Sequence, residues 1–212
     1  METTGGIRIF ERLNCAFPEK EIFLRLGGNC FKTTLDETAK LKLMQISRNA
    51  FELCSPQGRF SVLPVTGISG NGVHTPEGFL ELGKKFCSAT QHASHLWMGA
   101  VTIGGELTRR RDASTTVTDS AIADAVGSEC ADAAMDVLYS LARSELLRRG
   151  LALDGQRFSP GYGDMPLALQ SFFYRKLNMD QMGVSLNTNN FLLPEKSVTA
   201  FAFIHNLQEK QP

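Results

Sequence analysis

The longest helical pattern in the chain runs from about Asp119 to Arg148 and constrains the fold more than any other feature. Thr116 and Asp119 supply the polar residues with which helices usually begin. Small side chains crowd the first half of this helix, where they let another backbone approach closely. We therefore expect a strand or a second helix to pack directly against it. These small residues are Ala121, Ala123, Ala125, Gly127, Ser128, Ala131, Ala133 and Ala134.

Two apolar stretches predict strands in the interior of a sheet. One covers residues 96–103 and includes Trp97, and the other covers residues 198–205. Both are far shorter than the roughly 20 residues that cross a bilayer, so no membrane segment is predicted. A tryptophan inside such a run is more typical of a core residue than of a platform for a cofactor. The three arginines at 109–111 follow the first run and are interpreted as a solvated loop.

Alternating, β-branched and capped patterns predict the remaining elements. Strands are expected at residues 7–13, 59–68 and 183–187. Helices are expected between Pro18 and Gly27 and at residues 36–53, 75–89 and 167–177, the second of them with Thr34 and Glu37 as its capping pair. The sequence contains no internal repeat and no Pro/Ser-rich linker. Residues 1–212 are therefore predicted to form a single α+β domain.

Charge and cysteine content argue against several classes of protein. Lys+Arg and Asp+Glu both number 22, so no net positive field favours a nucleic acid. The five cysteines are widely spaced without a Cys-x-x-Cys pair, which indicates buried thiols in a reducing cytoplasm. Charged residues interrupt the apolar N-terminus, so a signal peptide is not expected. His92 and His95 have no third ligand apparent, and they are interpreted as structural residues rather than as a metal site.

The segment from Arg157 to Tyr162 has the composition of a ligand-binding loop. Pro160 fixes its own φ angle and pushes Ser159 toward an extended conformation. Gly161 has no Cβ, so its backbone can lie close to a ligand. The guanidinium of Arg157 matches a carboxylate through two parallel charged hydrogen bonds, and Tyr162 adds an aromatic face and a hydroxyl. Taken alone, a Ser-Pro-Gly-Tyr sequence is more often a surface turn.

Three stretches match the pattern of one known family. The first is Arg157-x-x-x-Gly161-Tyr162, and the second is residues 191–205, which begin Phe-Leu-Leu-Pro-Glu-Lys-Ser-Val. The third is the helix Cys-Ala-Asp-Ala-Ala-Met-Asp-Val-Leu at residues 130–138, where Asp132 falls at the position of an acidic ligand contact that is usually a glutamate. Together they make the chain resemble the S-adenosylmethionine-binding reactivation domain of cobalamin-dependent methionine synthase. The continuation Gly-Asp-Met-Pro at residues 163–166 is similar to the free-standing bacterial members.

The resemblance implies a fold, a ligand and a reaction. The implied fold is a central, mainly antiparallel, twisted sheet flanked by helices. The implied contacts of S-adenosylmethionine are Arg157, Pro160, Gly161, Tyr162 and Asp132. In the family, one electron and a methyl group from S-adenosylmethionine restore methylcobalamin from an inactive cobalt(II) state. Such a protein acts by positioning the methyl donor over the corrin and needs no general base of its own.

The resemblance also implies partners. The chain is too short to contain cobalamin, folate and homocysteine domains, so we expect it to act in trans in the cytoplasm. Its partner would be a separate corrinoid-dependent methionine synthase or methyltransferase that carries the cobalamin, with a flavodoxin or ferredoxin as electron donor. One alternative is a non-catalytic module that senses S-adenosylmethionine or binds a corrinoid protein. An ordinary methyltransferase would need a glycine-rich loop after the first strand, and residues 7–17 contain no glycine.

Overall fold

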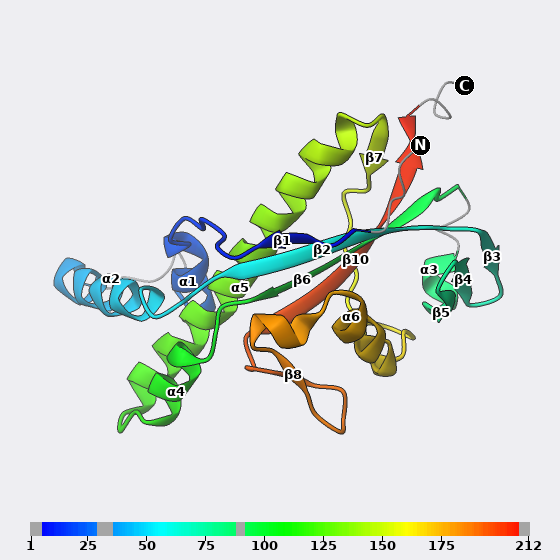
Figure 1. Ribbon diagram of the computed structural model, residues 1–212. Helices are drawn as coiled ribbons and strands as arrows, with labels where there is room; N and C mark the ends of the chain where they lie inside the picture. The colour runs from blue at the N-terminus through cyan, green and yellow to red at the C-terminus, as the bar shows by residue number, and fades with distance from the viewer. Residues whose placement is uncertain (1–5, 29–35, 88–91, 208–212) are drawn as a thin grey trace.

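A computed structural model describes residues 6–28, 36–87 and 92–207. Its main sheet has five strands in the order β1-β2-β6-β10-β7, and all neighbouring strands are antiparallel (Figure 1). The predicted α+β architecture with a mainly antiparallel sheet is confirmed. The five strands are β1 (Arg8–Phe10), β2 (Gln57–Pro64), β6 (His95–Thr102), β7 (Leu151–Leu153) and β10 (Ser197–Asn206).

The central strand β6 divides the core between the two faces of the sheet. It pairs with β2 from Gln57↔Thr102 onward and with β10 from Ser197↔Thr102 onward. Successive side chains of a strand point to opposite faces. Trp97 therefore packs in the core beneath the long helix, whereas Met98 belongs to the core on the other face. Trp97 is 0% exposed, which confirms its predicted place in the core.

The long helix α5 (Val117–Leu147) covers one face of the sheet, as the long green helix of Figure 1. The hydroxyl of Thr116 accepts a hydrogen bond from the Asp119 N–H at 3.0 Å and caps the helix. Helices α1 (Glu19–Arg25), α2 (Glu37–Phe51) and α4 (Glu106–Asp112) pack against α5. The close approach predicted for its small residues occurs at Gly127, where an added Cβ would lie 3.3 Å from a methyl carbon of Leu107 in α4.

A second layer covers the opposite face. It contains α6 (Gln170–Lys176) and the short helices η1 (Leu167–Leu169) and η2 (Met179–Met182). Two small sheets complete the layer, one with β3 (Gly67–Ser69), β4 (Gly72–Thr75) and β5 (Gly78–Glu81), the other with β8 (Ser185–Leu186) and β9 (Leu192–Leu193). In the part of the chain that the structure describes, no helix is both long and apolar enough to cross a membrane.

Two sequence predictions about local structure are wrong. Residues 75–89 do not begin a helix: β4 and β5 form a hairpin there, and the short helix α3 (Lys84–Cys87) follows. The Thr75 hydroxyl accepts from the Glu77 N–H, and Gly78 adopts φ +119°, so this segment turns back on itself. The arginines at 109–111 lie in α4 rather than in a loop. Thr34 lies outside the described residues, and α2 begins at Glu37.

Candidate functional site

The predicted ligand loop, residues 157–162, leaves the main sheet beside β10. The Phe158 N–H donates to the Phe201 carbonyl at 2.9 Å, and the Phe201 N–H donates to the Phe158 carbonyl at 2.8 Å. The chain then bends, with the Tyr162 N–H donating to the Ser159 carbonyl at 3.1 Å. Gly161 has φ +88°, a conformation that favours glycine. The tight bend expected from the sequence is therefore present and is anchored to a central strand.

The outer part of the ligand loop carries its aromatic residue. Tyr162 is 65% exposed, and its ring centroid lies 6.3 Å from that of Phe86, while Pro160 is half-buried. Asp164 fixes the far side of the loop, because its Oδ2 accepts a hydrogen bond from the Lys84 N–H at 2.8 Å. The loop thus presents a rigid backbone with an exposed aromatic face.

Arg157 turns toward α5. Its Nη2 donates to Asp136 Oδ1 at 2.5 Å, and its Cζ lies 5.1 Å from the centroid of the Tyr139 ring. The Arg157 side chain is 29% exposed. Among the described residues, Asp136 is the only carboxylate that pairs with this guanidinium. Within the same described residues, Nη2 is the only nitrogen of the guanidinium that donates a hydrogen bond. The other N–H groups of Arg157 have no hydrogen-bond acceptor among the described residues and could donate to a ligand.

Tyr139 is held rigidly beneath Arg157. Its hydroxyl donates to the Asp154 carbonyl, and its ring meets the Trp97 ring edge-on, with centroids 5.0 Å apart and planes at 86°. Burial raises the pKa of Tyr139 to about 12, so the hydroxyl remains a donor at neutral pH. A cation over an aromatic face contributes about 0.5–2 kcal/mol. The core therefore fixes the position of the guanidinium. We call Arg157, Asp136 and Tyr139 the Arg157 centre.

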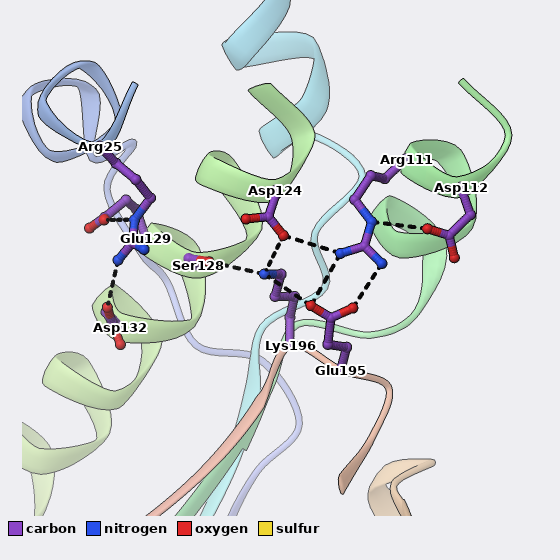
Figure 2. A network of polar contacts seen from close by, with 9 residues as sticks. All are labelled: Arg25, Arg111, Asp112, Asp124, Ser128, Glu129, Asp132, Glu195 and Lys196. Carbon is purple, nitrogen blue, oxygen red and sulfur yellow. Dashed lines mark hydrogen bonds and ion pairs between the residues drawn. The ribbon is translucent and has the colours of Figure 1, made fainter. Parts of the chain in front are cut away.

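Asp132 lies one turn before Asp136 on α5. Its carboxylate is 3.8 Å from Nη2 of Arg25 in α1, and Arg25 also pairs with Glu129 (Figure 2). Partial desolvation, followed by repulsion from Glu129, raises the pKa of Asp132. Both carboxylates lie on the stretch of helix beside Arg157, and Asp136 is the one in contact with it. Sequence reasoning missed Asp136, although its spacing of four residues from Asp132 places both on one helical face.

A second polar cluster ties the segment before β10 to α4 and α5 (Figure 2). Arg111 donates to both oxygens of Glu195, at 3.1 and 2.8 Å, and to Asp124 at 3.1 Å. Lys196 Nζ donates to Asp124 at 2.7 Å and to Ser128 at 3.0 Å. We call these five residues the hairpin cluster, which is distinct from the hairpin of β4 and β5. Its members are Arg111, Asp124, Ser128, Glu195 and Lys196. Arg111 is thus a bridging residue and not part of a solvated loop, which corrects the sequence interpretation.

The comparison with solved structures shows which fold the chain has. No protein-family model matches the sequence, and no curated protein matches it. A crystal structure of the MetH reactivation domain bound to AdoHcy matches 93% of this chain and 80% of its own length, with a TM-score of 0.61 and 17% sequence identity. The chain has the fold of that domain. The antiparallel sheet flanked by helices that the resemblance implied is therefore confirmed.

The reactivation-domain fold explains why distant residues meet at the ligand loop. Strand β10 anchors Phe158, and α5 brings Asp132 and Asp136 to the side of Arg157. The loop and the helical acids are more than 20 residues apart in sequence, yet they form one charged surface. Such a surface combines an open cation, two carboxylates and an exposed aromatic ring. Chemically, it suits a ligand that carries both a carboxylate and an ammonium group.

Proposed function

We propose that the chain binds S-adenosylmethionine through the ligand loop and the adjoining turn of α5. The observation that carries this proposal is the partly unsatisfied guanidinium of Arg157 beside the Gly161 bend, in a fold whose solved example holds AdoHcy. AdoHcy is S-adenosylmethionine without its transferable methyl group. Arg157 receives the carboxylate of the ligand, and Asp132 receives its ammonium group. Pro160, Gly161 and Tyr162 form the wall beside them.

Magnitudes decide how much these two charges can contribute. Micromolar affinity corresponds to about 8 kcal/mol. A hydrogen bond to a charged group contributes about 1.5–3 kcal/mol. Arg157 and Asp132 therefore supply only part of the binding free energy. Backbone N–H groups near Gly161 and the exposed ring of Tyr162 supply the rest. Because Asp136 already occupies Arg157, the ligand carboxylate either shares the guanidinium with it or displaces it.

The reaction that we propose is reductive remethylation of a cobalamin carried by a separate corrinoid-dependent methionine synthase or methyltransferase in the cytoplasm. A flavodoxin or ferredoxin supplies the electron. The cobalamin bound by the partner would, once reduced, supply the nucleophile. The residues of this chain bind the methyl donor and fix its orientation, which is catalysis by positioning. The exposed Tyr162 and the open side of the Arg157 centre are where the corrinoid partner would meet the ligand.

Calorimetric titration with S-adenosylmethionine and AdoHcy tests the assignment of the loop. Arg157→Ala should weaken binding about 10- to 150-fold, the loss of one charged hydrogen-bonding group. Arg111→Ala is the matched control, because it removes a guanidinium of the hairpin cluster and leaves the ligand loop intact. Equal affinities of wild type and Arg157→Ala would contradict the proposal.

A turnover assay separates the reaction from simple binding. Purified protein, S-adenosylmethionine, a reductant and a corrinoid protein should yield methylcobalamin, and Arg157→Ala should slow its formation. Tight binding without any methylcobalamin would instead favour a module that senses S-adenosylmethionine or binds the corrinoid protein. The loop assignment would survive that result, since it depends on affinity alone.

A further inference from the structure

Two thiols line a cavity that the proposed function does not use. The cavity has a volume of about 550 Å³ and lies between residues 11–15 and most of residues 51–56. Cys15 and Cys54 both line it, and both are half-buried. The cavity follows the C-terminal end of α2, whereas the ligand loop lies beside β10. Small solutes can therefore reach a cysteine here without passing the ligand loop.

A third thiol lies in the core on which Cys54 packs. Cys130 of α5 is 0% exposed and belongs to the apolar cluster against which Cys54 packs. Cys54 is also the group that most strongly raises the pKa of Cys130, as expected for a neighbouring side chain in this cluster. Its Sγ also faces the Ala50 carbonyl at 3.9 Å. Cys15, Cys54 and Cys130 are all free thiols in this structure. An accessible thiol in the segment after α2 and a buried thiol of α5 thus pack in the same apolar cluster.

The three thiols differ in their chemistry. Burial raises the pKa of Cys15 to about 11, and its Sγ donates toward the Leu13 carbonyl at 3.7 Å. The hydrogen bond with Cys54, followed by burial, raises the pKa of Cys130. Because the thiolate is the reactive form, Cys15 and Cys130 are poor first nucleophiles at neutral pH. Cys54 is the cysteine that both lines the cavity and packs against the cluster that contains a second thiol, Cys130.

We propose that Cys54 and Cys130 are a redox pair that a peroxide entering this cavity oxidises to a disulfide. The Cys54 sulfur attacks one peroxide oxygen, the O–O bond breaks, and sulfenic acid forms on Cys54 as water departs. The Cys130 sulfur then attacks the Cys54 sulfur and the S–O bond breaks. The departing hydroxide takes the Cys130 proton and becomes water. Two electrons pass from the two thiols to one peroxide.

The crosslink would join the segment after α2 to α5. Cys130 precedes Asp132 by two residues on that helix, so oxidation fastens α2 to the element that carries the acidic side of the ligand surface. The proposal does not rest on ligand binding, since it concerns a separate cavity and its own thiols. A disulfide that closes a long loop also restricts the unfolded chain. The oxidised protein should therefore unfold at a higher denaturant concentration than the reduced protein.

Oxidation followed by peptide mapping tests the pair. The full chain is treated with hydrogen peroxide, the remaining thiols are alkylated, and a digest without reductant is analysed by mass spectrometry. We expect a peptide that links Cys54 to Cys130, with the mass of two hydrogen atoms lost. Cys15→Ser is the matched control and should give the same linked peptide. Absence of the Cys54–Cys130 link, or a link from Cys54 to Cys15 in its place, would overturn the proposal.

Variants of the buried thiol test the order of the two steps. Cys130→Ala removes the second thiol without burying a hydroxyl, and it should leave Cys54 as a sulfenic acid that dimedone labels. Circular dichroism checks that this variant is folded. If it is not, Cys54→Ser provides the same test, because it should abolish both the linked peptide and dimedone labelling in this cavity. Persistent crosslinking of Cys130 in Cys54→Ser would contradict the assigned order.

Discussion

The hairpin cluster and the Arg157 centre place cations against the same helix in opposite ways. In the hairpin cluster, Arg111 and Lys196 both pair with Asp124 and Glu195, and Lys196 also donates to the Ser128 hydroxyl (Figure 2). At the Arg157 centre, one guanidinium meets one described carboxylate and an aromatic ring. A cation with several carboxylate partners from different segments holds those segments together and has few donors left for a ligand. Arg157, by contrast, has unpaired N–H groups and packs on the Tyr139 ring, so it can still bind an external anion.

The largest effect is expected where the support of the Arg157 centre is broken. A Cβ at Gly99 would overlap the Trp97 ring, so Gly99→Ala should destabilise the protein by about 1–3 kcal/mol. Displacement of Trp97 would also move Tyr139, which under the proposed function should weaken binding of S-adenosylmethionine. Chemical denaturation and the emission of Trp97, the sole tryptophan of the chain, measure both. Gly155→Ala is the matched control, since no atom lies within 4 Å of an added Cβ there. Equal stability of the two variants would refute the supporting role.

A smaller effect is expected from the ring beneath Arg157. Tyr139→Leu removes the aromatic face and should lower the affinity for S-adenosylmethionine by about 0.5–1 kcal/mol, or about two- to fivefold. Tyr139→Phe keeps the ring and loses the hydrogen bond to the Asp154 carbonyl, so its affinity should stay closer to that of wild type. Calorimetry with both variants separates the ring from the hydroxyl. A greater loss in Tyr139→Phe than in Tyr139→Leu would argue against support by the ring.

The smallest effect concerns the pH dependence of stability, which has opposite signs for the hairpin cluster and for Asp132 beside the Arg157 centre. Hydrogen bonds from Lys196 and Arg111 lower the pKa values of Asp124 and Glu195 from their ordinary 3.8 and 4.5. Their stabilisation is therefore fully present above these ordinary values and is lost as pH falls through the lowered ones. Both carboxylates are about half exposed, so each contributes about 0.2–1 kcal/mol.

Asp132 should respond in the opposite direction. Its pKa is raised, so its contribution to stability is present at low pH and is lost as pH rises through the raised value. Denaturation curves between acidic and neutral pH measure the sum of the two responses. Lys196→Met should reduce the acid-induced loss, and Asp132→Asn should remove the opposing part. An unchanged acid profile in Lys196→Met would show that the hairpin cluster does not set it.

Sequence patterns predicted the elements with strong periodicity or long apolar runs. Helix α5, strands β6 and β10 and the bend at Gly161 all occur where the patterns placed them. The hairpin of β4 and β5 was missed because Thr-Pro-Glu begins helices as readily as it forms a turn. The turn forms instead of a helix because Gly72–Thr75 pairs with Gly78–Glu81. That pairing depends on contacts with the rest of the core.

The polar contacts were predictable only in part. The sequence pointed to Arg157, Gly161 and Tyr162 by their chemistry, but not to Asp136 as the partner of Arg157. Asp132 and Asp136 share a helical face, and the direction in which α5 lies across the sheet decides which of them the guanidinium reaches. The hairpin cluster joins residues that are far apart in sequence, such as Arg111 and Glu195, and no local pattern links them.

The pair of backbone hydrogen bonds between Phe158 and Phe201 separates the origin of the ligand loop from its tip. These bonds use main-chain atoms alone, so they persist whatever side chains follow. Under the proposed function, substitutions of Pro160 and Tyr162 can therefore alter which molecule is recognised, while Gly161 keeps the bend and the starting point of the loop stays fixed. A library of variants at these two positions, with Gly161 kept, should yield new ligand preferences without loss of folding.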